Sequence, residues 1–373
     1  MKIAFLVSGN YNTSLYSVTK ETIDYLRMQG VQVDLIFLDS DNYSLLDSDN
    51  KIDIEKYHQG KFNEFFSRIT KKIIGRHAYD FLRSRWITKY LEEDIRDYDI
   101  IFVHGSIYIL LHTLSIPHMC VLHSCKFDNF LGHRRGLKKK IYQYIYRRVY
   151  DNKYLLTVSE SVKLDLIHKM RSIPLSIETI YNGFNFKKLV DKSNEGDTQN
   201  VPENFIMAAG RPDKTKRFDI LLQAYAKSRQ KLPLVIFGDG RNLNKIKRLA
   251  IKLKIDNKVI FWGFCNDLLP YFKQASAYIL SSDVEGLPTV VIESLAVGTP
   301  VVATDVGGVS ELLGERLKEW IVPRRDVDAL ARKIDQVLES PPLVGPEDLT
   351  FLDYRVVGEK YKKLSEKMKN GLL

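Results

Sequence analysis

Residues 281–304 read SSDVEGLPTVVIESLAVGTPVVAT and directly follow the apolar run 277–280. Residues 277–280 and 300–303 are short apolar runs, which is typical of buried strands. The segment between them is long enough to contain a helix. Pro288 suits the first position of that helix. A strand, a polar loop, a helix and a second strand form a βαβ unit, which places the loop at the carboxyl edge of a parallel sheet, where ligands bind.

The same alternation of strand-like and helix-like segments extends from this unit in both directions. In the second half of the chain, apolar runs predict further strands at residues 205–209, 234–237 and 259–262. In the first half, such runs lie at residues 2–7, 31–37, 100–103, 119–122, 155–158 and 177–181. Between the halves, the segment DKSNEGDTQNVPEN at 191–204 is almost free of apolar side chains, as expected of an exposed linker.

The fold class that follows is α/β, with two Rossmann-like doubly wound domains. We expect an N-terminal domain at 1–190, a linker at 191–204, a C-terminal domain at 205–345 and a C-terminal helical segment at 346–373. The last helical pattern follows a proline-rich break and could fold back over either domain. The sequence leaves both arrangements open.

Composition and charge exclude several classes of protein. With 45% hydrophobic residues and a mean hydropathy of −0.21, the chain has enough apolar mass for two cores but is not mainly embedded in a membrane. The three cysteines show no C-x-x-C pairing, which argues against a disulfide framework or a zinc site and fits a reducing cytoplasm. The formal net charge of +10 implies an anionic partner, and nucleic acid, anionic lipid and phosphorylated substrates all satisfy it.

The start of the helix at Pro288 is a candidate anion site. The backbone amides there, including those of Leu287 and Thr289, and the helix dipole favour an anion such as a diphosphate. Gly286 would let that anion approach the backbone closely. Further along, Glu293 lies in a helix that is apolar nearly all round, so its carboxylate is expected to be buried and to need partners. A pair of sugar or ribose hydroxyls would satisfy it.

The run EGLPTVVIESLAVGTPVVATDVGG at 285–308 resembles the signature of the family-four retaining glycosyltransferases of the GT-B architecture. The resemblance extends through AGRPDKTKRFD at 209–219, FGDG at 237–240, VIFWGF at 259–264 and YNGFN at 181–185. It is weaker in the first half, at VHGS (103–106), VLHS (121–124) and TVSESV (157–162). It implies an enzyme whose two domains face each other across a cleft and transfer a sugar from a nucleotide donor to an acceptor hydroxyl.

The resemblance assigns roles to four charged residues. Glu285 matches the carboxylate beside the donor sugar, and Glu293 matches the one that holds the ribose diol. Arg211 and Lys216 match the basic pair at the donor diphosphate, where fixed positive charge stabilises the negative charge that develops as the glycosidic bond breaks. The plain structural alternatives are a loop cap for Glu285, a nearby base for Glu293 and a solvated basic turn for the two cations.

Further matches concern the nucleobase, the donor phosphates and the reacting sugar. Gly263 and Phe264 match the loop that reads the nucleobase, although a glycine after a strand also marks an ordinary turn. Gly238 lies in the FGDG motif and is assigned to the donor site with them. His123 matches a histidine near the reacting sugar, with a structural histidine as the alternative. His104 is a weaker match of the same kind.

The chain departs from the family pattern before the first helix, where Thr13 and Ser14 stand at the positions of the family's paired glycines. Side chains there hinder close approach of a phosphate or an acceptor, although the hydroxyls could donate hydrogen bonds instead. Gly9 is the remaining glycine of that loop and a candidate for such an approach. The acceptor contacts therefore cannot be carried over from the family.

A metal-dependent reaction is an alternative, because D-x-D triplets hold a divalent ion in other glycosyltransferases and occur in this chain. Such triplets begin at Asp39, Asp47, Asp97 and Asp326, and four occurrences make each one uninformative. Solvated turn aspartates are the better interpretation of the first two. If Arg211 and Lys216 neutralise the leaving group, no metal is required, and we expect no metal ligands.

Two segments interleave basic residues with aromatic and aliphatic ones: KFNEFFSRITKKIIGR at 61–76 and RRGLKKKIYQYIYRR at 134–148. One interpretation is a core-facing stripe with a solvated basic back. The other is a surface helix that docks on anionic lipid, which would suit a lipid-linked acceptor. No nucleic-acid-binding module is recognisable.

We therefore expect a retaining glycosyltransferase that moves a hexose or N-acetylhexosamine from a nucleotide sugar to a glycan or lipid-linked acceptor of a bacterial surface polysaccharide such as lipopolysaccharide or capsule. Family frequency favours UDP over GDP as the donor nucleotide. The alternatives are a GDP-mannose-dependent mannosyltransferase and a non-catalytic basic protein that binds anionic lipid or nucleic acid. The expected location is the cytoplasm, with the inner face of the cytoplasmic membrane as a peripheral site.

Overall fold

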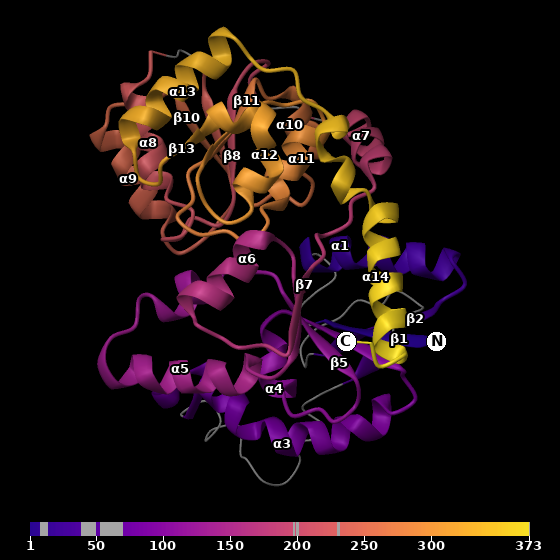
Figure 1. The fold of residues 1–373 in the computed structure, drawn as a ribbon. Coiled ribbons are helices and arrows are strands. Elements are labelled where there is room, and N and C mark those ends of the chain that lie inside the picture. Colours follow the sequence, from indigo (N-terminus) through magenta and orange to yellow (C-terminus); the bar gives the residue numbers. More distant parts are fainter. Residues whose placement is uncertain are drawn as a thin grey trace. The chain divides into compact units, whose positions relative to one another are not determined.

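The computed structural model describes residues 1–7, 14–38, 50–52, 70–196, 198, 201–229 and 232–372. The chain forms two compact units, one of Met1–Phe184 with Tyr354–Leu373 and one of Asn185–Asp353 (Figure 1). Each unit is built on a parallel sheet with helices on both faces. The prediction of an α/β protein with two Rossmann-like domains is confirmed.

The sheet of the first unit has the strand order β3-β2-β1-β4-β5-β6-β7. Its strands are β1 (Lys2–Val7), β2 (Gln32–Leu38), β3 (Asn50–Ile52), β4 (Ile100–His104), β5 (His118–Leu122), β6 (Tyr154–Thr157) and β7 (Ser176–Thr179). In the register of the central strands, Phe5 lies opposite Leu35 on one side and Phe102 on the other. The central strands are continuous apolar runs because helices cover both faces of a parallel sheet.

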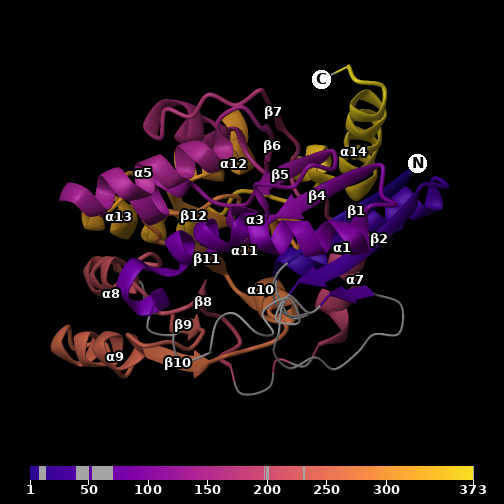
Figure 2. The same cartoon turned by 90° about the horizontal axis from the view of Figure 1, so that it is seen from below.

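The longer helices of the first unit lie on opposite faces of its sheet (Figure 1). One face carries α1 (Ser14–Met28) and α14 (Tyr354–Lys369), and the other carries α3 (Arg76–Ile95), α4 (Tyr108–Leu111) and α5 (Gly136–Tyr150). Figure 2 shows α3 in front of the strands, with α5 beside it. The shorter helices are η2 (Gly105–Ile107), η3 (Phe127–Leu131), α6 (Glu160–Leu164) and η4 (Asp165–Lys169).

The C-terminal helix α14 folds back onto the first unit, which decides the question that the sequence left open. The Tyr361 ring packs against Phe5 and Phe102 at centroid distances of 5.6 and 5.1 Å. A Cβ atom at Gly358 would lie 2.2 Å from the ring of Tyr25, so glycine is what allows α14 to approach α1. A helix-period pattern shows that one face of α14 is buried but not which domain buries it.

The sheet of the second unit has the order β10-β9-β8-β11-β12-β13. Its strands are β8 (Ile206–Ala209), β9 (Leu234–Phe237), β10 (Val259–Gly263), β11 (Ala277–Leu280), β12 (Val301–Thr304) and β13 (Ile321–Val322). Its helices are α7 (Phe186–Glu195), α8 (Phe218–Lys227), α9 (Leu243–Lys252), α10 (Leu269–Gln274), α11 (Thr289–Ala296), α12 (Val309–Leu317), η5 (Lys318–Trp320), α13 (Val327–Glu339) and η6 (Pro346–Leu352). Figure 1 shows α8, α9 and α13 on one face and α10, α11 and α12 on the other.

The boundaries of the two units differ from the predicted linker at 191–204 and from the predicted start of the terminal segment at 346. Helix α7 begins at Phe186, extends to Glu195 and packs against α10, so residues from Asn185 onward belong to the second unit. The polar composition after residue 190 includes the exposed last turn of this helix. At the other end, the second unit continues through η6 to Asp353.

Candidate functional site

The predicted donor-site residues converge on the carboxyl edge of the second sheet. Strand β8 lies between β9 and β11, so the connections that follow β8 and β11 leave this edge on opposite faces of the sheet. In open α/β sheets, ligands bind where the strand order reverses in this way. The loop after β8 carries Arg211 and Lys216, and the loop after β11 carries Glu285.

Lys216 and Glu285 form an ion pair across this switch point. Lys216 Nζ lies 2.7 Å from Glu285 Oε1, with the two side chains 21% and 13% exposed. The same Oε1 accepts a hydrogen bond from Ser282 Oγ at 2.6 Å. The structure therefore brings together two residues that lie 69 positions apart and were both predicted as site residues. Ser282 is a partner that the sequence did not single out.

Hydrogen bonds to backbone groups shape these two loops and hold them against each other. The Asp213 carboxylate accepts hydrogen bonds from the amides of Thr215 and Lys216, which folds the first loop into a tight turn. The amide of Asp283 donates to Thr215 O at 2.7 Å, and Ser281 Oγ donates to Lys216 O at 2.8 Å. The ion pair is therefore held on a fixed frame.

Two glycines allow the strands to approach closely beneath the site. Gly238 has a φ of +131°, and a Cβ atom there would lie 2.0 Å from the carbonyl oxygen of Gly210. Gly210 has a φ of +140°, and its Cβ atom would lie 2.9 Å from Cε of Lys216. Both φ values are rare for L-residues, and at Gly238 the backbone of Gly210 also leaves no space for a side chain. Gly238 therefore supports the loop that carries the lysine.

A second charge cluster, which the sequence analysis missed, fixes the loop after β11. The Asp283 carboxylate accepts hydrogen bonds from Arg217 Nη1 at 2.8 Å and from Arg325 Nη2 at 2.8 Å. Partial burial acts to raise the pKa of Asp283, but the hydrogen bonds from Arg325 and Arg217 outweigh it and lower this pKa. No local spacing signals this cluster, because its members come from three distant segments.

Glu293 is the fifth residue of α11, between the buried residues Ile292 and Ser294. Burial, with a smaller effect of the nearby Asp267 charge, raises the pKa of Glu293 to about 7. Among the residues that the structure describes, none donates a hydrogen bond to this carboxylate or pairs with it. The nearby base of the plain structural alternative is therefore not found among the residues that the structure describes. Donors such as hydroxyl groups would favour its ionised form.

Helix α11 begins at Thr289, one residue later than predicted, with Pro288 in the N-cap position. Helix starts predicted from sequence commonly differ by one or two residues, and the orphan amides of the first turn stay at the same edge. Leu287 and Pro288 are buried, and Thr289 is half-buried. The carbonyl of Gly286 accepts a hydrogen bond from the amide of Gly308 at 2.7 Å, which holds the loop before the helix.

Gly263 and Phe264 lie at the same edge, beyond the loop that follows β9. Gly263 ends β10 with a φ of +91°, and its carbonyl accepts a hydrogen bond from the amide of Gly238 at 2.6 Å. Phe264 follows it with 72% of its surface exposed. The exposed ring is a flat apolar surface on which an aromatic base could stack.

The basic residue Arg211 stands apart from the ion pair. It is exposed and has neither an ion pair nor a hydrogen bond with any other residue of the described ranges. A Cβ atom at Gly240 would lie 3.0 Å from Cγ of Arg211, so the stem of the arginine passes close to the loop after β9. Its guanidinium is therefore free to contact an anion.

In the first unit, His123 follows β5 and His104 ends β4, so both lie at the carboxyl edge of that sheet. His104 Nδ1 lies 2.9 Å from His123 Nε2, so one ring donates to the other. Burial, and then the charge of Lys126, lower the pKa of His123 to about 3, and burial lowers the pKa of His104 as well. His123 is therefore neutral at physiological pH, and the hydrogen bond between the two rings fixes their relative orientation.

Other predicted positions fall partly outside the described residues. Gly9 and Thr13 lie outside them, and Ser14 begins α1, but its side chain is not described. The D-x-D triplets at 39–41 and 47–49 also lie outside. In the remaining triplets, Asp99 accepts a hydrogen bond from the amide of Lys2, and Asp326 caps α13. Within the described part of the chain, no group of three His, Cys, Asp or Glu side chains could hold a metal ion.

Comparison with protein families assigns both halves of the chain. Residues 17–188 match the model described as Glycosyltransferase Family 4, and residues 191–349 match the model described as Glycosyl transferases group 1. The chain belongs to the family-four glycosyltransferases. It is a transferase enzyme of the GT-B fold.

Individual relatives agree with this assignment. A Campylobacter jejuni 4-alpha-N-acetylgalactosaminyltransferase, named for an N-acetylgalactosamine-N,N'-diacetylbacillosaminyl-diphospho-undecaprenol acceptor, is 27% identical over 66% of this chain and 68% of its own. A lipopolysaccharide core biosynthesis glycosyltransferase of Rhizobium meliloti is 32% identical over 37% of this chain and 40% of its own. The solved structure of Anabaena HepE in complex with UDP-glucose has a TM-score of 0.69 at 16% identity, over 98% of this chain and 100% of that one.

In the described part of the chain, no helix combines the length and the hydrophobicity that crossing a bilayer requires.

Proposed function

We propose that this glycosyltransferase moves a hexose or N-acetylhexosamine from a UDP-sugar to a hydroxyl of a glycan or lipid-linked acceptor, with retention at the anomeric carbon, in the synthesis of a bacterial surface polysaccharide. In this proposal, the second domain binds the donor and the first binds the acceptor. The observation that carries it is the Lys216–Glu285 ion pair at the switch point of the second sheet.

The donor diphosphate would lie between the start of α11 and the two cations, Arg211 and Lys216. Backbone amides at a helix N-terminus and fixed positive side chains are both suited to phosphate oxygens. Glu293, which has no hydrogen-bond donor in the described structure, would accept hydrogen bonds from the ribose diol. Gly263 and Phe264 would contact the base. The UDP-glucose bound to the structurally similar HepE supports UDP as the nucleotide.

The charges of the site suit cleavage of the sugar–phosphate bond. As this bond breaks, negative charge builds up on the departing diphosphate, and Lys216 and Arg211 would stabilise it where it develops. Glu285, held by Lys216 and Ser282, would lie beside the donor sugar and bond its hydroxyls. The departing phosphate would help to accept the proton of the acceptor hydroxyl on the same face of the sugar, which gives retention. The two cations supply the positive charge, so we expect no requirement for a metal.

The acceptor is proposed from the first domain and from the relatives. His123, neutral and oriented by His104, can hold a hydroxyl group of the acceptor or the reacting sugar. The Campylobacter relative is named for a diphospho-undecaprenol acceptor, which supports a lipid-linked glycan as the acceptor class. Such an acceptor would bring the enzyme to the inner face of the cytoplasmic membrane.

Calorimetric titration of UDP and GDP without added metal tests the donor site. We expect UDP to bind the wild-type protein, GDP to bind at least 10-fold more weakly, and Glu293→Gln to weaken UDP binding about 10- to 100-fold because hydrogen bonds to the carboxylate are lost. Asp256→Asn is the control, since Asp256 is exposed in the turn before β10, at the amino edge of the same sheet. Stronger binding of GDP would favour a GDP-mannose donor, and equal UDP binding by Glu293→Gln would refute the site.

A further inference from the structure

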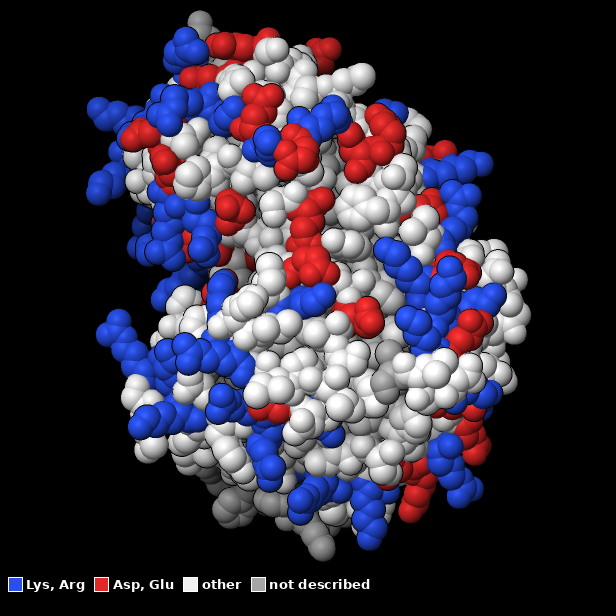
Figure 3. Space-filling view, in the orientation of Figure 1, with Lys and Arg blue, Asp and Glu red and all other residues white. Residues whose placement is uncertain are grey.

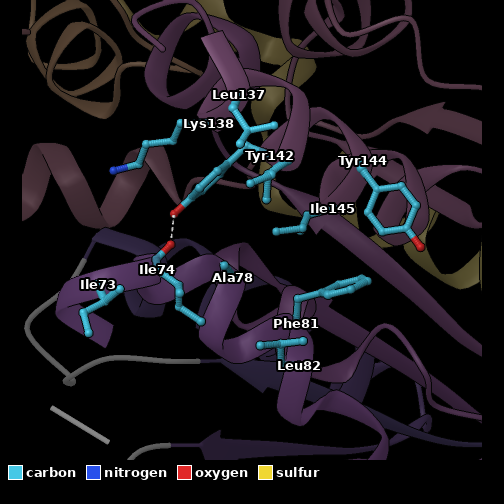
Figure 4. Close-up of a pocket in the computed structure, with 11 residues that line it drawn as sticks. Ile73, Ile74, Ala78, Phe81, Leu82, Leu137, Lys138, Tyr142, Tyr144 and Ile145 are labelled. Carbon is cyan, nitrogen blue, oxygen red and sulfur yellow. Dashed lines mark hydrogen bonds between the residues drawn. The ribbon is translucent and has the colours of Figure 1, made fainter. Parts of the chain in front are cut away.

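An apolar groove runs between α3 and α5 in the first unit. Its volume is about 580 Å³. It is lined by Ile73, Ile74, Ala78, Phe81, Leu82, Leu137, Lys138, Ile141, Tyr142, Tyr144 and Ile145 (Figure 4). Figure 4 shows Leu137, Tyr142 and Ile145 of α5 opposite Ala78, Phe81 and Leu82 of α3 and Ile74 just before it, with the Tyr142 hydroxyl bonded to the carbonyl of Ile74.

The groove leaves a continuous apolar stripe exposed. On α5, Leu137, Ile141 and Tyr144 follow one another at helical spacing and are 73%, 46% and 57% exposed. On the opposite wall, Ile73 and Leu82 are also exposed. Large apolar side chains that gather in one concave place, instead of being scattered singly, mark an interaction site.

A second, polar cavity of about 950 Å³ adjoins the groove and shares Phe81, Leu82 and Tyr144 with it. Its wall carries four cations that form no ion pair with any described residue: Arg85, Lys89, Arg148 and Lys153. Its two carboxylates are already occupied by other donors. Glu92 accepts hydrogen bonds from Ser115, and Asp151 accepts one from the amide of Ile173.

The excess of positive charge is close to the apolar surface. Lys153 is half-buried, and its burial lowers its pKa, so a neighbouring anion would stabilise its charged form. The guanidinium of Arg148 lies 5.9 Å from the ring centroid of Tyr144, which lines both cavities. An apolar groove that opens into an unneutralised cationic cavity is complementary to a molecule with a hydrocarbon chain and an anionic head.

We propose that the groove between α3 and α5 and the adjoining cationic cavity form a seat for an anionic phospholipid of a bilayer surface. The hydrocarbon chain occupies the apolar groove, and the phosphate of the headgroup contacts Arg148 and Lys153. Both volumes fall within the range of pockets that hold small ligands, roughly 300–1,000 Å³.

The surroundings of the seat favour a bilayer as the source of this lipid. Helix α5 carries further exposed cations at Lys138, Lys140 and Arg147. In Figure 3, Lys and Arg side chains gather with white, uncharged surface over the region of α5, where acidic side chains are sparse. Each basic residue near an anionic membrane adds attraction, and tyrosine is suited to the boundary between headgroups and chains.

Vesicle co-sedimentation of the full chain tests the seat. The probes are vesicles of phosphatidylcholine alone and vesicles of phosphatidylcholine with about 30% phosphatidylglycerol. The phosphatidylglycerol gives the vesicle surface a negative charge. We expect binding to the anionic vesicles and at least 10-fold weaker binding to the neutral ones. Inorganic phosphate at millimolar concentration should not displace the protein, because free phosphate lacks the chain.

Two double variants separate the two parts of the seat. Arg148→Gln with Lys153→Gln should weaken binding to anionic vesicles about 30-fold, and Leu82→Gln with Leu137→Gln should weaken it at least 10-fold without altering the charge. Lys245→Gln with Arg248→Gln is the control for lost charge, since both are exposed cations on α9, and it should bind within twofold of the wild type. All four positions in the seat variants face solvent or a cavity, so thermal unfolding should be little changed.

Equal binding of the wild type and both seat variants would overturn the proposal, as would equal binding to neutral and anionic vesicles. Binding of an oligonucleotide in place of vesicles would also overturn it and would assign the cations to nucleic acid. The proposal is independent of the donor site: the seat variants should bind UDP as the wild type does, whereas a failed nucleotide titration would leave the vesicle result unchanged.

Discussion

Lys216 and Glu285 lie 2.7 Å apart across the point where the strand order of the second sheet reverses. The two residues come from different loops, because Lys216 follows β8 and Glu285 follows β11, and the fold brings these loops together. Charges that are largely shielded from water interact more strongly than exposed ones, so the pair holds both side chains in position before a substrate arrives. A donor sugar-diphosphate would meet a preorganised cation and carboxylate.

The first prediction concerns turnover. Glu285→Gln keeps the size of the side chain but removes the charge that positions Lys216, so kcat should fall about 100-fold or more, while KM for the donor changes only a few-fold. Steady-state kinetics with saturating acceptor measure both. Asp256→Asn should retain wild-type values. A rise in KM with unchanged kcat would instead show that Glu285 contributes to binding alone.

The second prediction concerns the pH dependence of UDP binding. The pKa of Glu293 is about 7 in the free protein, and hydrogen bonds from the ribose would lower it in the complex. The complex then binds fewer protons than the free protein, so affinity should rise between pH 6 and pH 8 and level off above the pKa of the free protein. Titrations in buffers of different ionisation enthalpy should show proton release.

Glu293→Gln is the matched variant for that experiment, because the phosphate of UDP also titrates near pH 6. The variant should retain the phosphate contribution and lose the remainder of the pH dependence. Identical pH profiles for the wild type and the variant would show that Glu293 does not titrate on binding.

The third prediction concerns stability. Asp283→Asn removes the charge shared by Arg217 and Arg325 and should lower the free energy of unfolding by about 2 kcal/mol at pH 7. The pKa of Asp283 is lowered in the folded protein, so its contribution is present above its ordinary value of 3.8 and is lost as the pH falls through the folded pKa. Denaturant unfolding at pH 7 and pH 3.5 should show a difference that shrinks at the lower pH. A constant difference would refute the ionic origin.

The fourth prediction concerns the close approach of β8 and β9. Gly238→Ala would place a Cβ atom 2.0 Å from the carbonyl of Gly210, so the loop that carries Lys216 must shift. We expect a loss of about 2 kcal/mol or more in stability and at least 10-fold weaker UDP binding. Gly30→Ala is the control: its φ is also positive, but no atom lies within 4 Å of the Cβ position. It should be destabilised by strain alone and should bind UDP normally.

Much of the second unit could be predicted from local sequence. The apolar runs at 205–209 and 277–280 are short and buried, so their spacing predicted strands, and the loops after them had to reach one edge of a parallel sheet. The family resemblance then assigned roles in these loops to Arg211, Lys216 and Glu285 before any contact was known. The acceptor contacts of the first half could not be predicted in the same way, because Thr13 and Ser14 depart from the family pattern.

The sequence by itself determined the α/β class, the two domains and the residue types at the carboxyl edge of the second sheet, because strand and helix periods and motif spacing are local properties of the chain. Only the tertiary structure decided that α14 packs on the first unit, that Asp283 joins Arg217 to Arg325 and that α3 and α5 enclose an apolar groove beside cations that pair with no described residue. Each of these depends on contacts between distant segments, and a pattern along one segment shows that a face is apolar or charged but not what lies against it.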